Sequence, residues 1–188
     1  VGELHLEIIC DRIRRQFNIE VYTGKAYVAY RESVRGDAFT ESFRFDRMMG
    51  GKRMFAGITV CVVPTGKSTK STVSLSPEIK KSLSAEEVYS LTDGFQNAFA
   101  AGPKGYPIVG VEVTVENIER DNDTTHGALR ACSHFFIDHV MKTRDRVLLE
   151  PAMSLYIELP EKYIGDVLSD LTVKRRADIG EVNATGDH

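Results

Sequence analysis

The segment Gly66-Lys67-Ser68 has the residue types that end a phosphate-binding loop. Such a loop also needs a glycine five residues before Gly66, so that bare backbone amides can surround the phosphate, and Cys61 occupies that position. The residues after Lys67 lack the pattern of an amphipathic helix, so no helix N-terminus would face the phosphate. We therefore predict that this segment binds no nucleotide.

Histidine and cysteine side chains are the next candidates for chemistry. His134 and His139 lie five residues apart, whereas two metal ligands on one helix face are spaced by four, and Cys132 and His134 point in different directions. Cys10, Cys61 and Cys132 form no Cys-x-x-Cys pair, which argues against a zinc site or a disulfide framework. The sequence offers no Ser–His–Asp or Cys–His arrangement. We therefore expect no catalytic residue and no metal site in this chain. We expect it to act by binding a partner.

The overall composition limits the class of partner. The 188 residues carry 24 Lys and Arg against 27 Asp and Glu, a formal net charge of −3, so the chain as a whole is not a strongly basic nucleic-acid binder. Apolar residues make up 42% and charged residues 27%, which is typical of a globular protein with a buried core. No apolar run approaches the roughly 18 residues of a membrane span, so we expect no membrane partner.

Two local groups of cations remain of interest. The first is Gly50-Gly51-Lys52-Arg53, a predicted loop flanked by Met48, Met49, Met54 and Phe55. The second is Lys174-Arg175-Arg176, at the end of the last predicted helix, where cations also favour the helix dipole. Paired cations beside apolar groups can dock on an RNA backbone and unstacked bases. A solvated surface is the simpler interpretation of either group taken alone.

Hydrophobic periodicity predicts the elements that position these residues. A first helix ends at Asn18 and buries a stripe of Leu6, Ile9, Ile13 and Phe17. Helices are also predicted over 84–101, with Ser84 and Glu87 as a capping box, from the 121–125 loop to about 141, and over 161–176. Strands are predicted over 19–22, 27–30, 39–45, 58–63 (buried on both faces), 109–115 and 155–159, and residues 64–76 are predicted to be a mobile connection. The pattern indicates a mixed α/β or α+β fold with a boundary near Glu150-Pro151.

Several blocks, in order, resemble the elongation factor G family of translational GTPases. The blocks are Gly2-Glu3-Leu4-His5-Leu6-Glu7 with residues 11–15, Val28-Ala29-Tyr30-Arg31-Glu32-Ser33, Ala101-Gly102-Pro103 with Gly105-Tyr106-Pro107, Leu148-Leu149-Glu150-Pro151 with Met153, and Gly165-Asp166-Val167-Leu168 with Asp170-Leu171. They cover nearly the whole chain. The resemblance implies the end of domain III over 1–24, domain IV over 25–150 and a truncated start of domain V over 151–188.

The resemblance also implies the fold and the parent activity. Domain IV would have a ribosomal-protein-S5-like α/β fold with a left-handed βαβ crossover, an exception to the right-handed rule, flanked by partial ferredoxin-like domains. The parent would be a GTPase whose GTP and Mg²⁺ bind in a G domain outside this chain, and the chain itself would hold no cofactor. It would act as a monomer, with ribosomal RNA as partner and no DNA.

Two loops at the tip of the family's domain IV align with the candidate site residues. The first is Gly50, Gly51, Lys52, Arg53, Met54 and Phe55, and the second is Arg120, Asp121, Asn122 and Asp123. Translocating factors carry a glycine-rich first loop and a histidine where this chain has Arg120. A Lys-Arg first loop without that histidine is more similar to the second, mitochondrial-type factor, which splits ribosomes together with ribosome recycling factor.

That similarity implies a mitochondrial protein of ribosome recycling, with the bacterial cytoplasm as the alternative location. Two other functions remain open on the sequence: a translocation factor of elongation whose tip has diverged, and a stand-alone α/β RNA-binding module.

Overall fold

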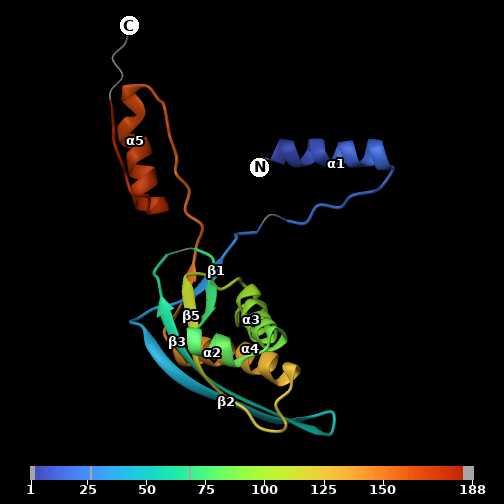
Figure 1. Cartoon of the computed structure of the whole chain (residues 1–188). Helices are drawn as coiled ribbons and strands as arrows, with labels where there is room; N and C mark the ends of the chain where they lie inside the picture. Colours follow the sequence, from blue (N-terminus) through green and yellow to red (C-terminus); the bar gives the residue numbers. More distant parts are fainter. Residues whose placement is uncertain (1–2, 26, 68, 184–188) are drawn as a thin grey trace. The chain divides into compact units, whose positions relative to one another are not determined.

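The computed structural model describes residues 3–25, 27–67 and 69–183. Gly2 of the first family block, Ser68 of the phosphate-loop-like segment and the tail 184–188 lie outside these residues. The chain divides into two units, Val1–Pro151 and Ala152–His188, and each is described by itself (Figure 1). None of the described helices is long and apolar enough to span a bilayer.

The first unit contains a four-stranded sheet of order β2-β3-β5-β4. Its strands are β2 (Phe39–Met49), β3 (Lys52–Pro64), β4 (Thr72–Leu75) and β5 (Val111–Glu119). Strand β4 runs parallel to β5, and the chain between them forms α2 (Pro77–Ser82) and α3 (Ala85–Ala100), which gives a βαβ unit. The other pairs are antiparallel. The prediction of a mixed α/β sheet protein is confirmed.

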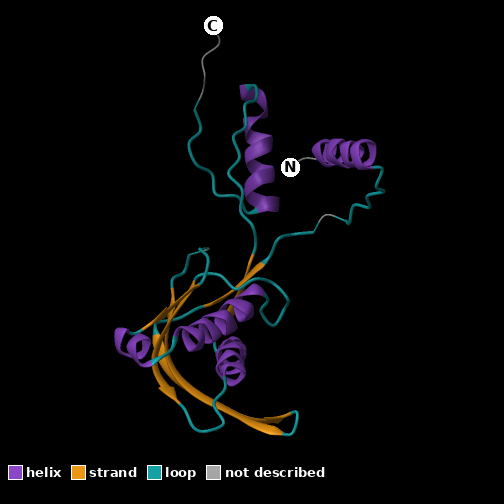
Figure 2. Ribbon diagram, turned by 45° about the vertical axis from the view of Figure 1, so that its right-hand side comes forward, coloured by secondary structure: helices purple, strands orange, loops and turns teal. Residues whose placement is uncertain are grey.

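Helices α3 and α4 (His126–Thr143) pack together on one face of this sheet (Figure 2). The core between the layers is apolar and aromatic, and its largest fully buried side chains include Phe45, Phe95, Phe136, Leu91 and Leu129. The prediction that residues 58–63 are buried on both faces is wrong. Thr59 and Cys61 are half-buried and Val63 is 37% exposed, because the helices cover one face of β3 only.

A second, two-stranded sheet pairs β1 (Arg31–Val34) with β6 (Arg146–Leu149), antiparallel. The predicted strands at 19–22, 27–30 and 155–159 are absent, since a strand requires a hydrogen-bonded neighbour and the described chain supplies none there. Residues 64–76 are not entirely a loose connection, because Thr72–Leu75 form β4. Lys52 and Arg53 are also not in a loop: they begin β3.

The terminal helices form where the periodicity predicts them. Helix α1 (Glu3–Phe17) ends at Asn18, which has a left-handed backbone with φ of 52° and donates its amide to the Arg14 carbonyl. Its apolar stripe is not buried as predicted: Leu6, Ile9 and Phe17 are exposed, because no described element covers them. In the second unit a short turn of helix (Glu161–Tyr163) leads into α5 (Ile164–Ser169) and a final turn (Asp170–Lys174).

Candidate functional site

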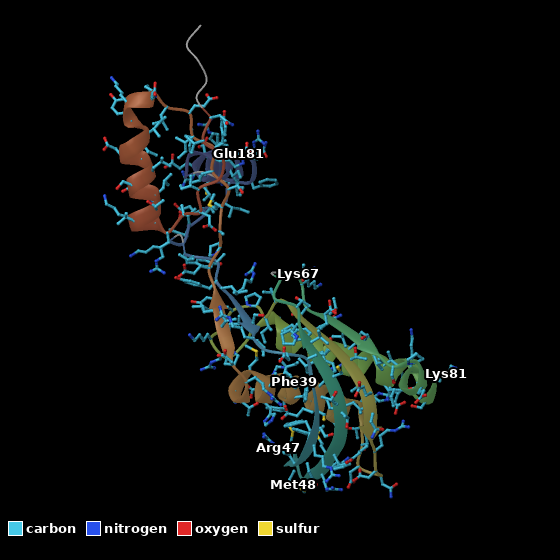
Figure 3. All side chains as sticks on the ribbon, turned by 90° about the vertical axis from the view of Figure 1, so that its left-hand side faces the viewer. Phe39, Arg47, Met48, Lys67, Lys81 and Glu181 are labelled. Carbon is cyan, nitrogen blue, oxygen red and sulfur yellow. The ribbon has the colours of Figure 1, made fainter. Side chains whose placement is uncertain are left out.

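The long β2–β3 hairpin ends in a two-residue turn at Gly50 and Gly51. Both glycines have positive φ, 58° and 77°, and the strands pair up to Met49 opposite Lys52. A turn of this kind requires a left-handed backbone at both central positions, which glycine adopts without steric cost. The two glycines therefore fix the register of the hairpin, and Figure 3 shows Arg47 and Met48 at its outer end.

This register sorts the side chains of the hairpin end onto two faces, because directly opposed residues of paired strands share a face. One face, called the Arg47 face, carries Arg47 opposite Met54 and Met49 opposite Lys52. The other face, called the Arg53 face, carries Asp46 opposite Phe55 and Met48 opposite Arg53. The sequence suggests that Lys52 and Arg53 form one cationic pair, whereas the strand directs them to opposite faces.

Arg53 is surrounded by three carboxylates. Its Nε and Nη2 donate to Asp46 at 2.9 and 2.7 Å, and its Nη1 donates to Asp121 at 2.8 Å and to Asp123 at 3.0 Å. The guanidinium also lies 5.0 Å from the centre of the Phe55 ring. The hydrogen bond from Arg53 lowers the pKa of Asp46, and the same bond is the main cause of a raised pKa of Arg53. These bonds tie the 120–125 loop to the hairpin.

The 120–125 loop is itself ordered by local hydrogen bonds. The Asp121 carboxylate accepts from the Asp123 amide at 2.8 Å, and the Asp121 amide donates to Thr124 Oγ1 at 2.9 Å. Thr125 then caps α4 by accepting from the Ala128 amide. The Phe55 amide lies 3.5 Å from the Asp123 carbonyl, so the two segments predicted to form the tip lie side by side.

Arg120 is directed to helix α3 and not to Arg53. Its Nη1 donates to Glu87 Oε1 at 2.9 Å, and Glu87 also accepts from the Ser84 amide in the capping box at 2.8 Å. The Ser84 hydrogen bond is the main cause of the lowered pKa of Glu87, and Arg120 adds to it. Of the remaining predicted site residues, Asn122 is exposed and Met54 is half-buried beside Gly127.

Arg47 is a site residue that the sequence pattern did not single out. Its guanidinium lies 4.8 Å from the centre of the Phe135 ring and 5.6 Å from that of Phe45. Among the described residues neither Arg47 nor Lys52 has a carboxylate within 4.0 Å. The alternation of Phe43, Phe45 and Arg47 along one strand face was the available signal.

The histidines and the cysteine of α4 have structural contacts. His139 Nε2 lies 2.8 Å from Glu41 Oε1, and Glu41 also accepts from Arg144 at 2.7 Å, the main cause of its lowered pKa. His134 packs against the ring of Phe135. Cys132 is buried, its thiol donates to the Ala56 carbonyl, and burial raises its pKa to about 12. The described residues contain no group of three or more His, Cys, Asp or Glu side chains that could hold a metal ion.

Two known proteins match this chain over nearly its whole length. The mitochondrial ribosome-releasing factor 2 of Danio rerio is 30% identical over 191 residues, which cover 100% of this chain and 25% of that protein. A crystal structure of a Thermus thermophilus protein matches with a TM-score of 0.61, covering 93% of this chain and 26% of its own. At 23% identity that likeness shows the fold alone. The chain therefore spans about a quarter of the length of both.

A family model supplies the assignment. The model described as elongation factor G, domain IV, matches residues 26–143, which include the whole four-stranded sheet, helices α2, α3 and α4 and all ten predicted tip residues. The chain belongs to the elongation factor G domain IV family.

Proposed function

We propose that this chain is the ribosome-binding region of an elongation factor G-like translational GTPase that acts in ribosome recycling. The observation that carries the proposal is the meeting of two segments far apart in sequence, 50–55 and 120–123, at the end of one hairpin. The Arg47 face of this hairpin presents two cations without carboxylate partners among the described residues. Cations on an ordered projection are suited to contact RNA phosphate.

The tip residues favour recycling over translocation. Translocation requires a shape-specific fit of the tip to the moving codon–anticodon duplex, which depends on close backbone approach. Here only the two turn residues are glycine, and the hairpin continues as strand from Lys52. Arg120 is a longer, permanently charged side chain whose guanidinium is paired with Glu87. Phosphate affinity is less sensitive to such changes than a shape-specific contact. The name of the Danio rerio relative, a ribosome-releasing factor, also supports recycling.

The remaining parts of the proposal concern the parent protein. GTP and Mg²⁺ would bind in a G domain outside this chain, and hydrolysis there would move the region described here on the ribosome. Ribosome recycling factor would be the protein partner, and the mitochondrion would be the compartment. In this scheme the residues of this chain bind and position, and they make no covalent bond.

Two assays on the full-length factor test the proposal. We expect it to split post-termination ribosomes with recycling factor and GTP, and to support little multi-codon translocation. Arg120→His restores the histidine of translocating factors, and Arg120→Gln is its matched control. Neither variant repairs the first loop, so we expect that neither gains translocation. Efficient translocation by the unchanged factor would support the translocase instead. Ribosome binding by the full-length factor without either activity would favour a stand-alone RNA-binding module.

A further inference from the structure

The two faces of the hairpin end carry opposite charge. On the Arg53 face one guanidinium is bonded to three carboxylates, those of Asp46, Asp121 and Asp123, so the cluster is formally anionic. On the Arg47 face Arg47 and Lys52 have no carboxylate within 4.0 Å among the described residues, so this face is cationic. A polyanion that approaches the hairpin end is therefore attracted to one face and repelled by the other.

Arg53 is poorly placed to bind phosphate. A phosphate oxygen would have to replace carboxylates at 2.7 to 3.0 Å, which already use Nε, Nη1 and Nη2 of the guanidinium. The released carboxylates would remain beside the phosphate and repel it. The hydrogen bonds of Arg53 hold the 120–125 loop against the hairpin, which is a structural role and not phosphate binding.

Arg47 has the opposite properties. Its guanidinium rests over the rings of Phe135 and Phe45, a contact that restricts the side chain without using its N–H donors. The ordering that reduces the entropic cost of binding is therefore already present before a partner arrives. Met49, on the same face, is 53% exposed and provides an apolar surface beside the two cations.

We infer that RNA docks on the Arg47 face, with its phosphates on Arg47 and Lys52, and that Arg53 is a positioning residue that holds the 120–125 loop against the hairpin from the opposite face. The inference deepens the proposed function and rests on it. Exposed Met49 favours RNA over an acidic protein segment, because an unstacked base can lie on an apolar side chain between two phosphate contacts.

The test compares two substitutions that remove the same charge from the same hairpin, Arg47→Gln and Arg53→Gln. Binding of the 188-residue chain to purified mitochondrial ribosomes, with bacterial ribosomes in parallel, is measured across a series of salt concentrations. Arg47→Gln should weaken binding about tenfold and reduce the slope of log affinity against log salt by about 1, since one phosphate contact is lost. Lys52→Gln should reduce the slope in the same way.

Arg53→Gln should leave the slope unchanged. It should instead accelerate hydrogen exchange of the Phe55 amide, which faces the Asp123 carbonyl, and of the Asp123 amide, which donates to the Asp121 carboxylate that Arg53 also binds. Arg53→Lys should restore that protection only in part because lysine lacks the planar fork. Arg47→Gln should leave this exchange unaltered. The two readouts thus separate a binding residue from a positioning residue.

Four outcomes would contradict the inference. Equal loss of slope in Arg47→Gln and Arg53→Gln would show that total charge, and not the face, determines binding. If the unchanged chain binds ribosomes and neither Arg47→Gln nor Lys52→Gln weakens that binding, the assignment of the docking face is wrong but the proposed function stands. No salt-dependent binding by the unchanged chain would overturn the proposed function as well. Binding to ribosomal protein but not to extracted ribosomal RNA would replace RNA by an acidic protein as the partner.

Discussion

Glu32 holds the 102–107 loop and Arg53 holds the 120–125 loop, each across about 70 residues of chain. Glu32 is 2% exposed, and its Oε1 accepts from the amides of Lys104 and Tyr106 at 3.0 and 3.2 Å. The Arg53 side chain is 40% exposed and is bonded to carboxylates that water also reaches. The same task is thus done once by a buried group and once by an exposed cluster.

Burial decides what each attachment contributes. Water and salt screen an exposed ion pair, so its net contribution is small, whereas removal of a buried acceptor leaves backbone amides without a partner. The 102–107 loop should therefore be fixed permanently, and the 120–125 loop should respond to salt and pH. Such a difference fits a scaffold that is rigid near β1 and adjustable at the hairpin end.

Replacement of Glu32 should have the largest effect on the free energy of unfolding. Glu32→Ala leaves the Lys104 and Tyr106 amides without their acceptor, and we expect a loss of roughly 2 to 5 kcal/mol in the free energy of unfolding. Glu32→Gln retains an acceptor oxygen and should lose less. Denaturant unfolding measures both, with the exposed Glu112→Gln as control. A loss no greater than that of the control would show that burial does not distinguish the two attachments.

Gly102→Ala should have the next largest effect. A Cβ at this position would lie 2.7 Å from Glu32 Cδ, so the carboxylate or the loop would have to shift, and overpacking of this kind costs roughly 1–3 kcal/mol. Gly24→Ala is the control, because no atom lies within 4 Å of its Cβ position. In a double-mutant cycle Glu32→Ala should remove most of the Gly102→Ala penalty. Additive losses would place the strain elsewhere.

Local chemistry explains what the sequence predicts correctly. The Ser84–Glu87 capping box lies within four residues, and the end of α1 at Asn18 depends on a single backbone conformation. Gly50 and Gly51 are correctly placed in a turn for the same reason. The pairing of β2 with β3 then shows that Lys52 and Arg53 belong to a strand and point to opposite faces, which the local pattern did not reveal.

Non-local partners explain what the sequence could not predict. Strand β4 exists because β5 lies parallel to it, and the alternating residues 19–22 and 155–159 lack such a neighbour in the described chain. The contacts of Arg53 join three segments, and no local pattern contains them. The ribosomal RNA role of the tip residues stays a prediction.

The exposure of Glu87 lies between that of buried Glu32 and that of Arg53, with its side chain 20% exposed. It accepts from the Ser84 amide and pairs with Arg120, so it links the capping box of α3 to the 120–125 loop. Ser84→Ala should lower the free energy of unfolding by about 1 kcal/mol through loss of the cap. Arg120→Gln should lower it by less. If thermal unfolding shows Arg120→Gln to be the more damaging, the pair with Glu87 and not the cap anchors this end of α3.

The smallest effect on stability is expected from the titration of Asp46, which tests most directly whether the exposed Arg53 cluster forms in solution. The hydrogen bond from Arg53 holds the pKa of this carboxyl below its ordinary value, so the stabilising interaction is present above that ordinary value and is lost as the pH falls through the lowered pKa. Arg53→Gln should return the pKa of Asp46 toward its ordinary value. The pKa of Glu119, lowered by the separate partner Arg44, should not move. Carboxyl NMR titration of both residues in the two proteins measures this, and added salt should raise the pKa of Asp46 in the unchanged chain because the exposed pair is screened. An Asp46 titration that is the same with and without Arg53 would show that the cluster does not persist in solution, and the 120–125 loop would then need another anchor.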